Sequence, residues 1–181
     1  AARVLPNGSV RVMGALGDGK NFVQSTYLSK DGYWPFYAQP YRRPGGSISG
    51  WLIFDQAESG LHGDLAWVKP VIDRDKYYPA GFSNSVAAIG SIYNSPGRSM
   101  NSVLPLVDGT VTLGGGELVH GLTKDIMLLT NKIVPIPKGE DQLSFTVIKN
   151  TGLFIGSVKL PGYTARVRFR GSLLQNRSAG Y

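Results

Sequence analysis

Residues 51–67, WLIFDQAESGLHGDLAW, decide the fold class of this chain. Apolar and polar residues alternate on both sides of a polar bend, which is the pattern of two short strands joined by a turn. Similar stretches, bounded by Gly, Pro, Asn or Asp, recur at 9–13, 47–54, 63–68, 109–113, 143–148, 156–160 and 164–174. The sequence therefore predicts an all-β protein of antiparallel strands.

The composition agrees with this prediction. The chain has 181 residues, of which 42% are hydrophobic, with 24 glycines and 11 prolines that favour tight turns. Only residues 118–129 resemble a helix, and Gly121 and the lack of an apolar stripe argue against one. We expect little or no helix, and no apolar run approaches the roughly 18 residues of a membrane span.

Two internal similarities indicate a duplication. Residues 8–37 and 156–181 share the order GSV, a basic residue, a glycine turn and a Phe-centred strand, and residues 51–67 match 143–160. We expect a duplicated antiparallel meander that closes into a barrel or stacks as a two-sheet sandwich. Its halves are predicted at 1–68 and 106–181. The Pro-, Gly- and Ser-rich connection 69–105 is predicted to pack on the sheet, giving one compact unit.

Charge and cysteine content limit the function classes. The net charge of +7 favours an acidic partner. Cysteine is absent, which excludes disulfides and thiolate metal sites but leaves the compartment open.

Several motifs together resemble a known domain. They include LSKDGYWPFY at 28–37, GWLIF at 50–54, LHGDLAWVKP at 61–70, YYPAGF at 77–82, TGLFIGSV at 151–158 and FRGSLLQNRSAGY at 169–181. This order resembles an uncharacterised β-rich domain, often C-terminal, of large secreted proteins of Verrucomicrobia and related environmental bacteria. The resemblance covers nearly the whole chain. It implies a secreted or cell-surface location, and it implies that a further closing strand follows the final Ala-Gly-Tyr.

Catalytic motifs are weak throughout the chain. Residues 14–20, GALGDGK, have the spacing of a phosphate-binding loop, but Asn21 follows where Ser or Thr is needed, so Asp18-Gly19 is interpreted as a hairpin turn. His62 and His120 are far apart, and pairs such as Asp73 and Asp75, or Glu140 and Asp141, lie in turn-like stretches. We expect no catalytic residue, metal or cofactor; a cleft that joins a histidine to an acid would revive an enzyme.

Basic residues form a candidate anion site. In an extended strand Arg166, Arg168 and Arg170 share one face, while Val167 and Phe169 face the other way. If Pro161-Gly162 makes a two-residue turn, Lys159 falls opposite Thr164 and joins this face. Arginine forks suit carboxylate or sulfate groups. The alternative is a solvated outer face that discourages edge pairing.

Aromatic residues form a candidate sugar platform. Its members are Tyr33, Trp34, Tyr37, Trp51 and Trp67. Along an extended chain Trp34 and Phe36 face one way and Tyr33 and Tyr37 the other, so the core needs only one of these pairs. Exposed aromatic faces attract the C–H faces of sugars. The alternative is that the three tryptophans form the core of the first half.

These features predict a non-catalytic extracellular or cell-surface module, structural or adhesive, that binds polysaccharide or an anionic envelope component. The alternative is an assembly subunit of a larger surface or envelope complex, which pairs with a neighbouring protein through the C-terminal edge at 169–181. Nucleic acid is not expected as a partner, because the resemblance implies secretion. The chain is not expected to span a membrane.

Overall fold

The chain folds into two compact units, Ala1–Ile92 and Tyr93–Tyr181. The computed structural model describes residues 1–42, 45–55, 57, 60–96, 103–104, 108–115, 118, 120–129, 132–136 and 139–181. Within these ranges the chain is all-β, and the one helical element is the 3₁₀ turn Gln175–Arg177. No helix in this part of the chain is long and apolar enough to cross a membrane.

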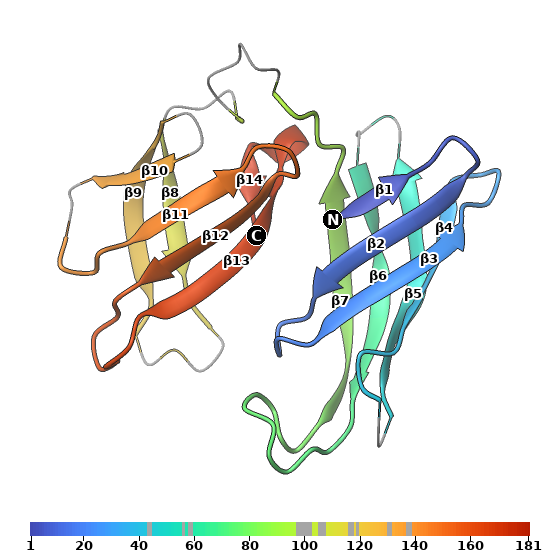
Figure 1. Cartoon of the computed structure of the whole chain (residues 1–181), viewed down its shortest axis with the longest axis horizontal. Coiled ribbons are helices and arrows are strands. Elements are labelled where there is room, and N and C mark those ends of the chain that lie inside the picture. The colour runs from blue at the N-terminus through green and yellow to red at the C-terminus, as the bar shows by residue number, and fades with distance from the viewer. Residues whose placement is uncertain are drawn as a thin grey trace. The chain divides into compact units, whose positions relative to one another are not determined.

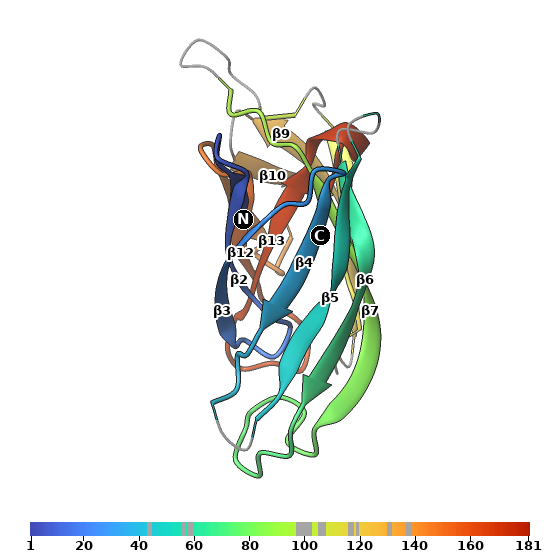
Figure 2. The ribbon, with the colours of Figure 1, turned by 90° about the vertical axis from the view of Figure 1, so that its right-hand side faces the viewer.

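The first unit has two antiparallel sheets, visible as two layers in Figure 1. One sheet contains β1 (Ala2–Val4), β2 (Ser9–Ala15) and β3 (Asn21–Tyr27). The other contains β4 (Tyr33–Ala38), β5 (Ser47–Asp55), β6 (Gly60–Lys69) and β7 (Phe82–Ser91), which lie side by side in Figure 2. Each strand pairs with its neighbour in the chain, apart from the step between β3 and β4.

Alternating side chains from both sheets fill the core of the first unit. Val10 and Val12 come from β2, and Trp34, Phe36 and Leu52 come from the facing sheet. The Trp34 ring is stacked with Phe54 and meets Phe36 edge-on, at 5.9 and 5.4 Å between ring centroids. This packing has the two-sheet sandwich arrangement, in which the inner faces of two sheets interdigitate.

The second unit is a single antiparallel meander. Its strands are β8 (Asp108–Leu113), β9 (Leu122–Leu129), β10 (Lys132–Ile136), β11 (Ser144–Ile148), β12 (Leu153–Val158), β13 (Val167–Leu174) and β14 (Ala179–Gly180). Each strand pairs with the next. The core joins Ile126 and Leu128 of β9 to Phe145, Val147 and Val158 of β11 and β12.

The all-β antiparallel fold is therefore as predicted, with open sheets and no closed barrel among the described strands. Residues 122–129 of the weak helical candidate form strand β9. The Asp18-Gly19 turn also forms: the Gly19 N–H donates to Leu16 O at 2.9 Å, and Gly19 has a φ of +83°. The GALGDGK motif is thus a hairpin turn in this fold.

The domain boundaries differ from those predicted. The predicted connection 69–105 contains β7, which pairs with β6 from Lys69–Phe82 to Gly60–Ser91 and so belongs to the first unit. The first unit ends at Ile92 rather than at 68, and each of the two units has its own core in place of one compact unit. The sequence misled because the Ser- and Ala-rich β7 alternates weakly. Residues 97–102 and 105 lie outside the described part.

Candidate functional site

The outer face of the β4–β7 sheet carries three exposed aromatic side chains. Tyr33 is 45% exposed, Tyr37 52% and Trp51 61%. Tyr33 and Tyr37 are four residues apart on β4, about 13 Å along the strand, and point to the same side. Trp51 on β5 lies opposite Pro35, between the levels of the two tyrosines. We call Tyr33, Tyr37 and Trp51 the aromatic face.

Register brings polar and apolar neighbours to the same surface. Trp51 is paired with Asp64 on β6, and Asp64 is paired with Ala87 on β7. Tyr33 is paired with Ile53 on β5, and Ile53 is paired with the exposed His62 on β6. Side chains of directly opposed residues project from the same face of a sheet. The aromatic face therefore continues into a carboxylate and an imidazole that are placed to hydrogen-bond a ligand lying across the strands.

The other two predicted platform residues do not belong to this surface. Trp34 is 1% exposed and lies in the core, where its Nε1–H donates to Gln24 Oε1 at 3.2 Å. Trp67 is half-buried and packs against the core, and its Nε1–H donates to Tyr41 Oη at 2.9 Å. The tryptophans are therefore divided between the two faces of the sheet, so neither the five-residue platform nor the all-tryptophan core is correct.

The predicted basic ridge is also divided. Arg168 and Arg170 are exposed on β13, opposite Ser157 and Ile155. Arg166 instead donates to Gln142 Oε1 at 2.8 Å and to Ser157 Oγ at 3.1 Å. Its guanidinium is thus engaged in holding the strand edge together. Of the three arginines, Arg168 and Arg170 have guanidinium groups that remain exposed on the strand face.

The position of Lys159 corrects the predicted pairing. The Pro161-Gly162 turn forms, with the Tyr163 N–H donating to Leu160 O at 3.2 Å. Pairing of β12 with β13 nevertheless starts at Val158–Val167, so the returning strand has two more residues than a two-residue hairpin requires. Lys159 is exposed beyond the end of β12 and is not opposite Thr164.

A buried ionic cluster lies at the end of β6 in the first unit. Lys69 contacts Asp75 and lies 3.4 Å from Asp18, whose Oδ2 accepts a hydrogen bond from Tyr41 Oη at 2.6 Å. Lys20 Nζ donates to Asp75 Oδ1 at 2.9 Å. Burial and then the hydrogen bond to Asp18 raise the pKa of Tyr41, whereas hydrogen bonds from Lys69 and Lys20 lower that of Asp75.

Sequence reasoning missed this buried ionic cluster. Asp75 lies in a turn-like stretch, as the sequence predicts, but its side chain is half-buried and paired with two lysines. One signal was present: Lys69 closes an alternating strand at a position that faces the core, and a lysine there requires a carboxylate partner. Which carboxylate forms the ion pair with Lys69 depends on contacts between distant segments.

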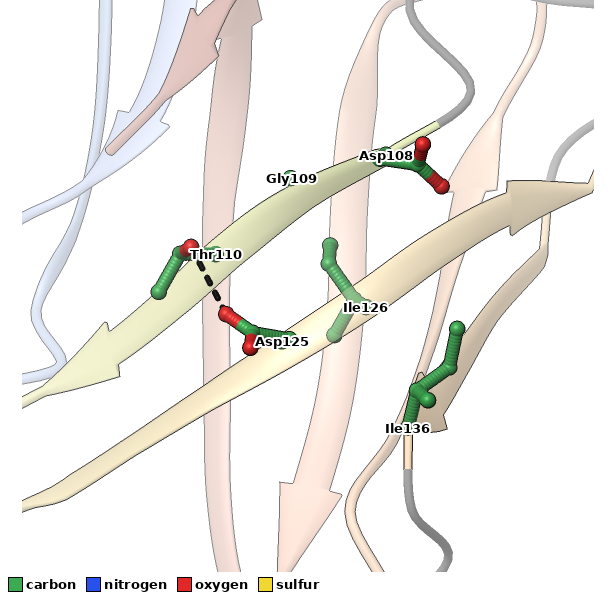
Figure 3. Close-up of a pocket in the computed structure, with 6 residues that line it drawn as sticks. All are labelled: Asp108, Gly109, Thr110, Asp125, Ile126 and Ile136. Atoms are coloured by element: carbon green, nitrogen blue, oxygen red, sulfur yellow. Dashed lines mark hydrogen bonds between the residues drawn. The ribbon is translucent and has the colours of Figure 1, made fainter.

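A shallow groove in the second unit contains two acids (Figure 3). It is lined by Asp108, Gly109, Thr110, Asp125, Ile126 and Ile136. Thr110 Oγ1 donates to Asp125 Oδ1 at 3.1 Å, which orients this carboxylate along the strand pair. Neither His62 nor His120 lines the groove. Among the described residues, no group of three or more His, Cys, Asp or Glu side chains is placed to hold a metal.

Comparisons with protein-family models, curated proteins and solved structures found no match to this chain. The functional assignment therefore depends on the surfaces described above.

Proposed function

We propose that this chain is a non-catalytic extracellular module that adheres to polysaccharide through the aromatic face. The observation that carries the proposal is the projection of Tyr33, Tyr37 and Trp51 from one sheet surface at exposures of 45%, 52% and 61%. Single exposed aromatics are ordinary on protein surfaces, but a contiguous apolar patch indicates an interaction site.

The shape of the surface supports a proposal about the kind of polysaccharide. The three rings lie on the outer face of adjacent, hydrogen-bonded strands. An open sheet face suits an extended chain whose sugar rings lie flat, and Asp64 beside Trp51 supplies an acceptor for hydroxyl groups. We propose insoluble, flat-chained polysaccharide as the ligand, and a secreted or cell-surface setting on the basis of the sequence resemblance.

The test is a depletion assay on insoluble polysaccharides such as cellulose and chitin, with the wild type beside Trp51→Ala. Loss of a ring that becomes buried in the complex is expected to weaken binding by at least about tenfold. Tyr27→Ala is the matched control, because Tyr27 is 66% exposed in the same unit but lies on β3. Equal binding by wild type and Trp51→Ala, or no binding by the wild type, would refute the proposal.

A second candidate function is assembly through the C-terminal edge. Strand β14 pairs with β13 only at Leu173 and Leu174, which leaves the outer edge of β13 from Val167 to Arg170 without a strand partner among the described residues. An open edge is a template for strand addition, although Arg168 and Arg170 on it discourage pairing. Sedimentation of the purified chain tests it: self-association that Arg170→Pro abolishes would support edge pairing.

An anionic component is the third element of the proposal. Arg168 and Arg170 provide a site for carboxylate or sulfate that is separate in sequence from the aromatic face. Binding through this pair is expected to weaken with added salt, whereas binding through Trp51 is expected to persist, because only the ionic contact is screened.

A further inference from the structure

Lys69, the last residue of β6, has a side chain with no exposure to solvent. Its Nζ lies 3.4 Å from Oδ2 of Asp18, which is equally buried, and contacts Oδ2 of Asp75. The Asp75 side chain is 17% exposed and lies six positions after Lys69 in the chain. One ammonium group is therefore held between two carboxylates at a site that excludes water from the nitrogen.

Tyr41 contacts this buried ionic cluster and is in turn held by Trp67. Tyr41 Oη donates to Asp18 Oδ2 at 2.6 Å, and the Tyr41 ring centroid lies 5.0 Å from Lys69 Nζ. Trp67 Nε1–H donates to the Tyr41 hydroxyl. Because the Lys69 side chain has no exposure to solvent, its ammonium protons face the two carboxylates rather than water, and transfer of a proton to one of them would leave a neutral amine. The resulting neutral amine is a nucleophile.

We infer that Lys69 and Asp75 condense into an intramolecular amide, a covalent cross-link that goes beyond the proposed function. Lys69 Nζ attacks Cγ of Asp75, so that one C–N bond forms and one C–O bond breaks. Two of the three ammonium protons leave with Oδ2 as one molecule of water, and the third remains on the amide nitrogen. The two charges of the ion pair cancel, so atoms, protons and electrons balance without a further reactant.

The neighbouring groups are placed for each part of this step. Asp18 accepts the two protons that Lys69 Nζ loses, one after the other, and returns each of them to the leaving oxygen. Lys20 Nζ, 2.9 Å from Asp75 Oδ1, stabilises the negative charge that develops on this oxygen when Cγ becomes tetrahedral. The Tyr41 hydroxyl positions Asp18. Oδ1 then becomes the amide oxygen and Oδ2 the leaving oxygen.

The second unit contains a comparable pair that serves as an internal control. Lys124 contacts Asp141, and their side chains are 10% and 16% exposed. Within the described ranges, Asp141 is the one carboxylate at ion-pair distance from Lys124. Without a second carboxylate to carry the proton, we expect this pair to stay ionic.

The cross-link has a structural consequence. The chain contains no cysteine, so disulfides cannot brace it. An amide from Lys69 to Asp75 ties the end of β6 to the start of the segment that leads to β7 at Phe82. This tie is expected to protect the segment from proteolysis.

The first measurement is the intact mass of the denatured wild-type chain. We expect a mass about 18 Da below that of the sequence, the loss of one water. A cyclic imide at an Asp-Gly step such as Asp18-Gly19 loses the same mass. The sample is therefore also incubated at mildly alkaline pH, which hydrolyses an imide and leaves an amide intact. A mass equal to that of the sequence, before or after this incubation, would overturn the inference.

Peptide mapping locates the bond. Trypsin cleaves after Arg74, between the two residues, but an amide keeps the two fragments joined. We expect one joined pair containing Lys69 and Asp75, and no joined pair containing Lys124 and Asp141. Recovery of the two first-unit fragments as separate peptides would contradict the cross-link.

Variants test the role of Asp18. Asp18→Asn preserves the shape of the side chain but removes the proton carrier, so we expect the full, unlinked mass. Asp73→Asn is the matched control, an exposed acid of the same segment, and is expected to keep the lower mass. Because Asp18→Asn removes a buried charge, near-ultraviolet circular dichroism checks its fold.

Lys20→Gln, at a partly exposed position, is expected to slow cross-linking after refolding at least about tenfold. Complete linkage at the wild-type rate in both variants would overturn the mechanism.

Discussion

Tyr33 and Trp34 are neighbours in the chain but serve opposite faces of their sheet. Tyr33 is 45% exposed and Trp34 is 1% exposed, because successive side chains of a strand point to opposite sides. One residue therefore contributes to stability and the next to the aromatic face. This division gives the proposed binding surface a rigid support, since Trp34 fixes the strand from beneath.

Substitutions in the aromatic residues are predicted to separate folding from binding. Trp34→Ala removes a fully buried ring and is expected to lower the free energy of unfolding of the first unit by about 3–5 kcal/mol. Trp51→Ala removes an exposed ring and is expected to change it by less than about 0.5 kcal/mol. Urea unfolding followed by fluorescence measures both. A large loss of stability in Trp51→Ala would show that the aromatic face has a structural role instead.

The carboxylate of Asp141 makes the stability of the second unit depend on pH. Burial opposes its ionisation, but the hydrogen bonds from Lys124 Nζ and the Leu143 N–H outweigh burial and lower its pKa below the ordinary 3.8. A lowered pKa in the folded state stabilises the fold above the unfolded pKa, and this stabilisation is lost as the pH falls through the folded pKa.

Asp141→Asn is expected to lower the free energy of unfolding by about 1–2 kcal/mol near neutral pH. This difference should shrink as the pH falls below 3.8 through the folded pKa, because the wild-type carboxyl then also becomes protonated. Urea titrations of the second unit at neutral pH and at a series of acidic pH values measure it. Asp125→Asn is the control, because Asp125 is exposed. A difference that stays constant with pH would contradict the role of the ion pair.

At the scale of the element, Gly156 explains how β12 packs. A Cβ built on this glycine would lie 2.4 Å from Cζ of Phe169 and 2.5 Å from Cβ of Phe145. The Phe169 ring and the Cβ of Phe145 lie directly over the strand backbone, so a side chain at this position would displace them. The predicted strand 156–160 places this glycine at its start, whereas the observed β12 runs from Leu153 to Val158 and holds it centrally.

Gly156→Ala is therefore expected to destabilise the second unit by about 1–3 kcal/mol, because two aromatic side chains must leave their positions. Ile155→Ala, on the exposed side of the same strand, is the control and is expected to change stability by less than about 0.5 kcal/mol. Thermal unfolding measures both variants. An unchanged midpoint for Gly156→Ala would mean that the core around the two phenylalanines adjusts without cost.

At the scale of the whole molecule, the two units are expected to fold separately. Each has its own cluster of buried residues, and the division falls between Ile92 and Tyr93. Fragments 1–92 and 93–181 are therefore predicted to show cooperative unfolding when expressed alone, as domains with independent cores do. A fragment 1–68, which lacks β7, is the comparison and should fail to fold. Circular dichroism with heating distinguishes these outcomes, and an unfolded fragment 1–92 would contradict the division.

Local structure follows directly from the amino-acid sequence. Alternation with a period of two specified strands, and glycine at positive φ specified the Asp18-Gly19 turn, because both depend on residues close in the chain. It also separated Tyr33 and Tyr37 from Trp34. These predictions needed only the geometry of one strand or one turn.

Contacts between residues that are distant in the chain depend on how the strands pair and pack. Register placed Trp51 beside the two tyrosines and Trp67 on the opposite face. Strand pairing places β7 in the first unit. The chain after the Pro161-Gly162 turn does not pair regularly, and the Arg166 side chain donates a hydrogen bond to Gln142. The carboxylate partners of Lys69 come from a hairpin turn and a connecting segment. Strand pairing and burial depend on contacts over the whole fold. The alternation of apolar and polar residues within one strand therefore does not specify which strand will lie opposite.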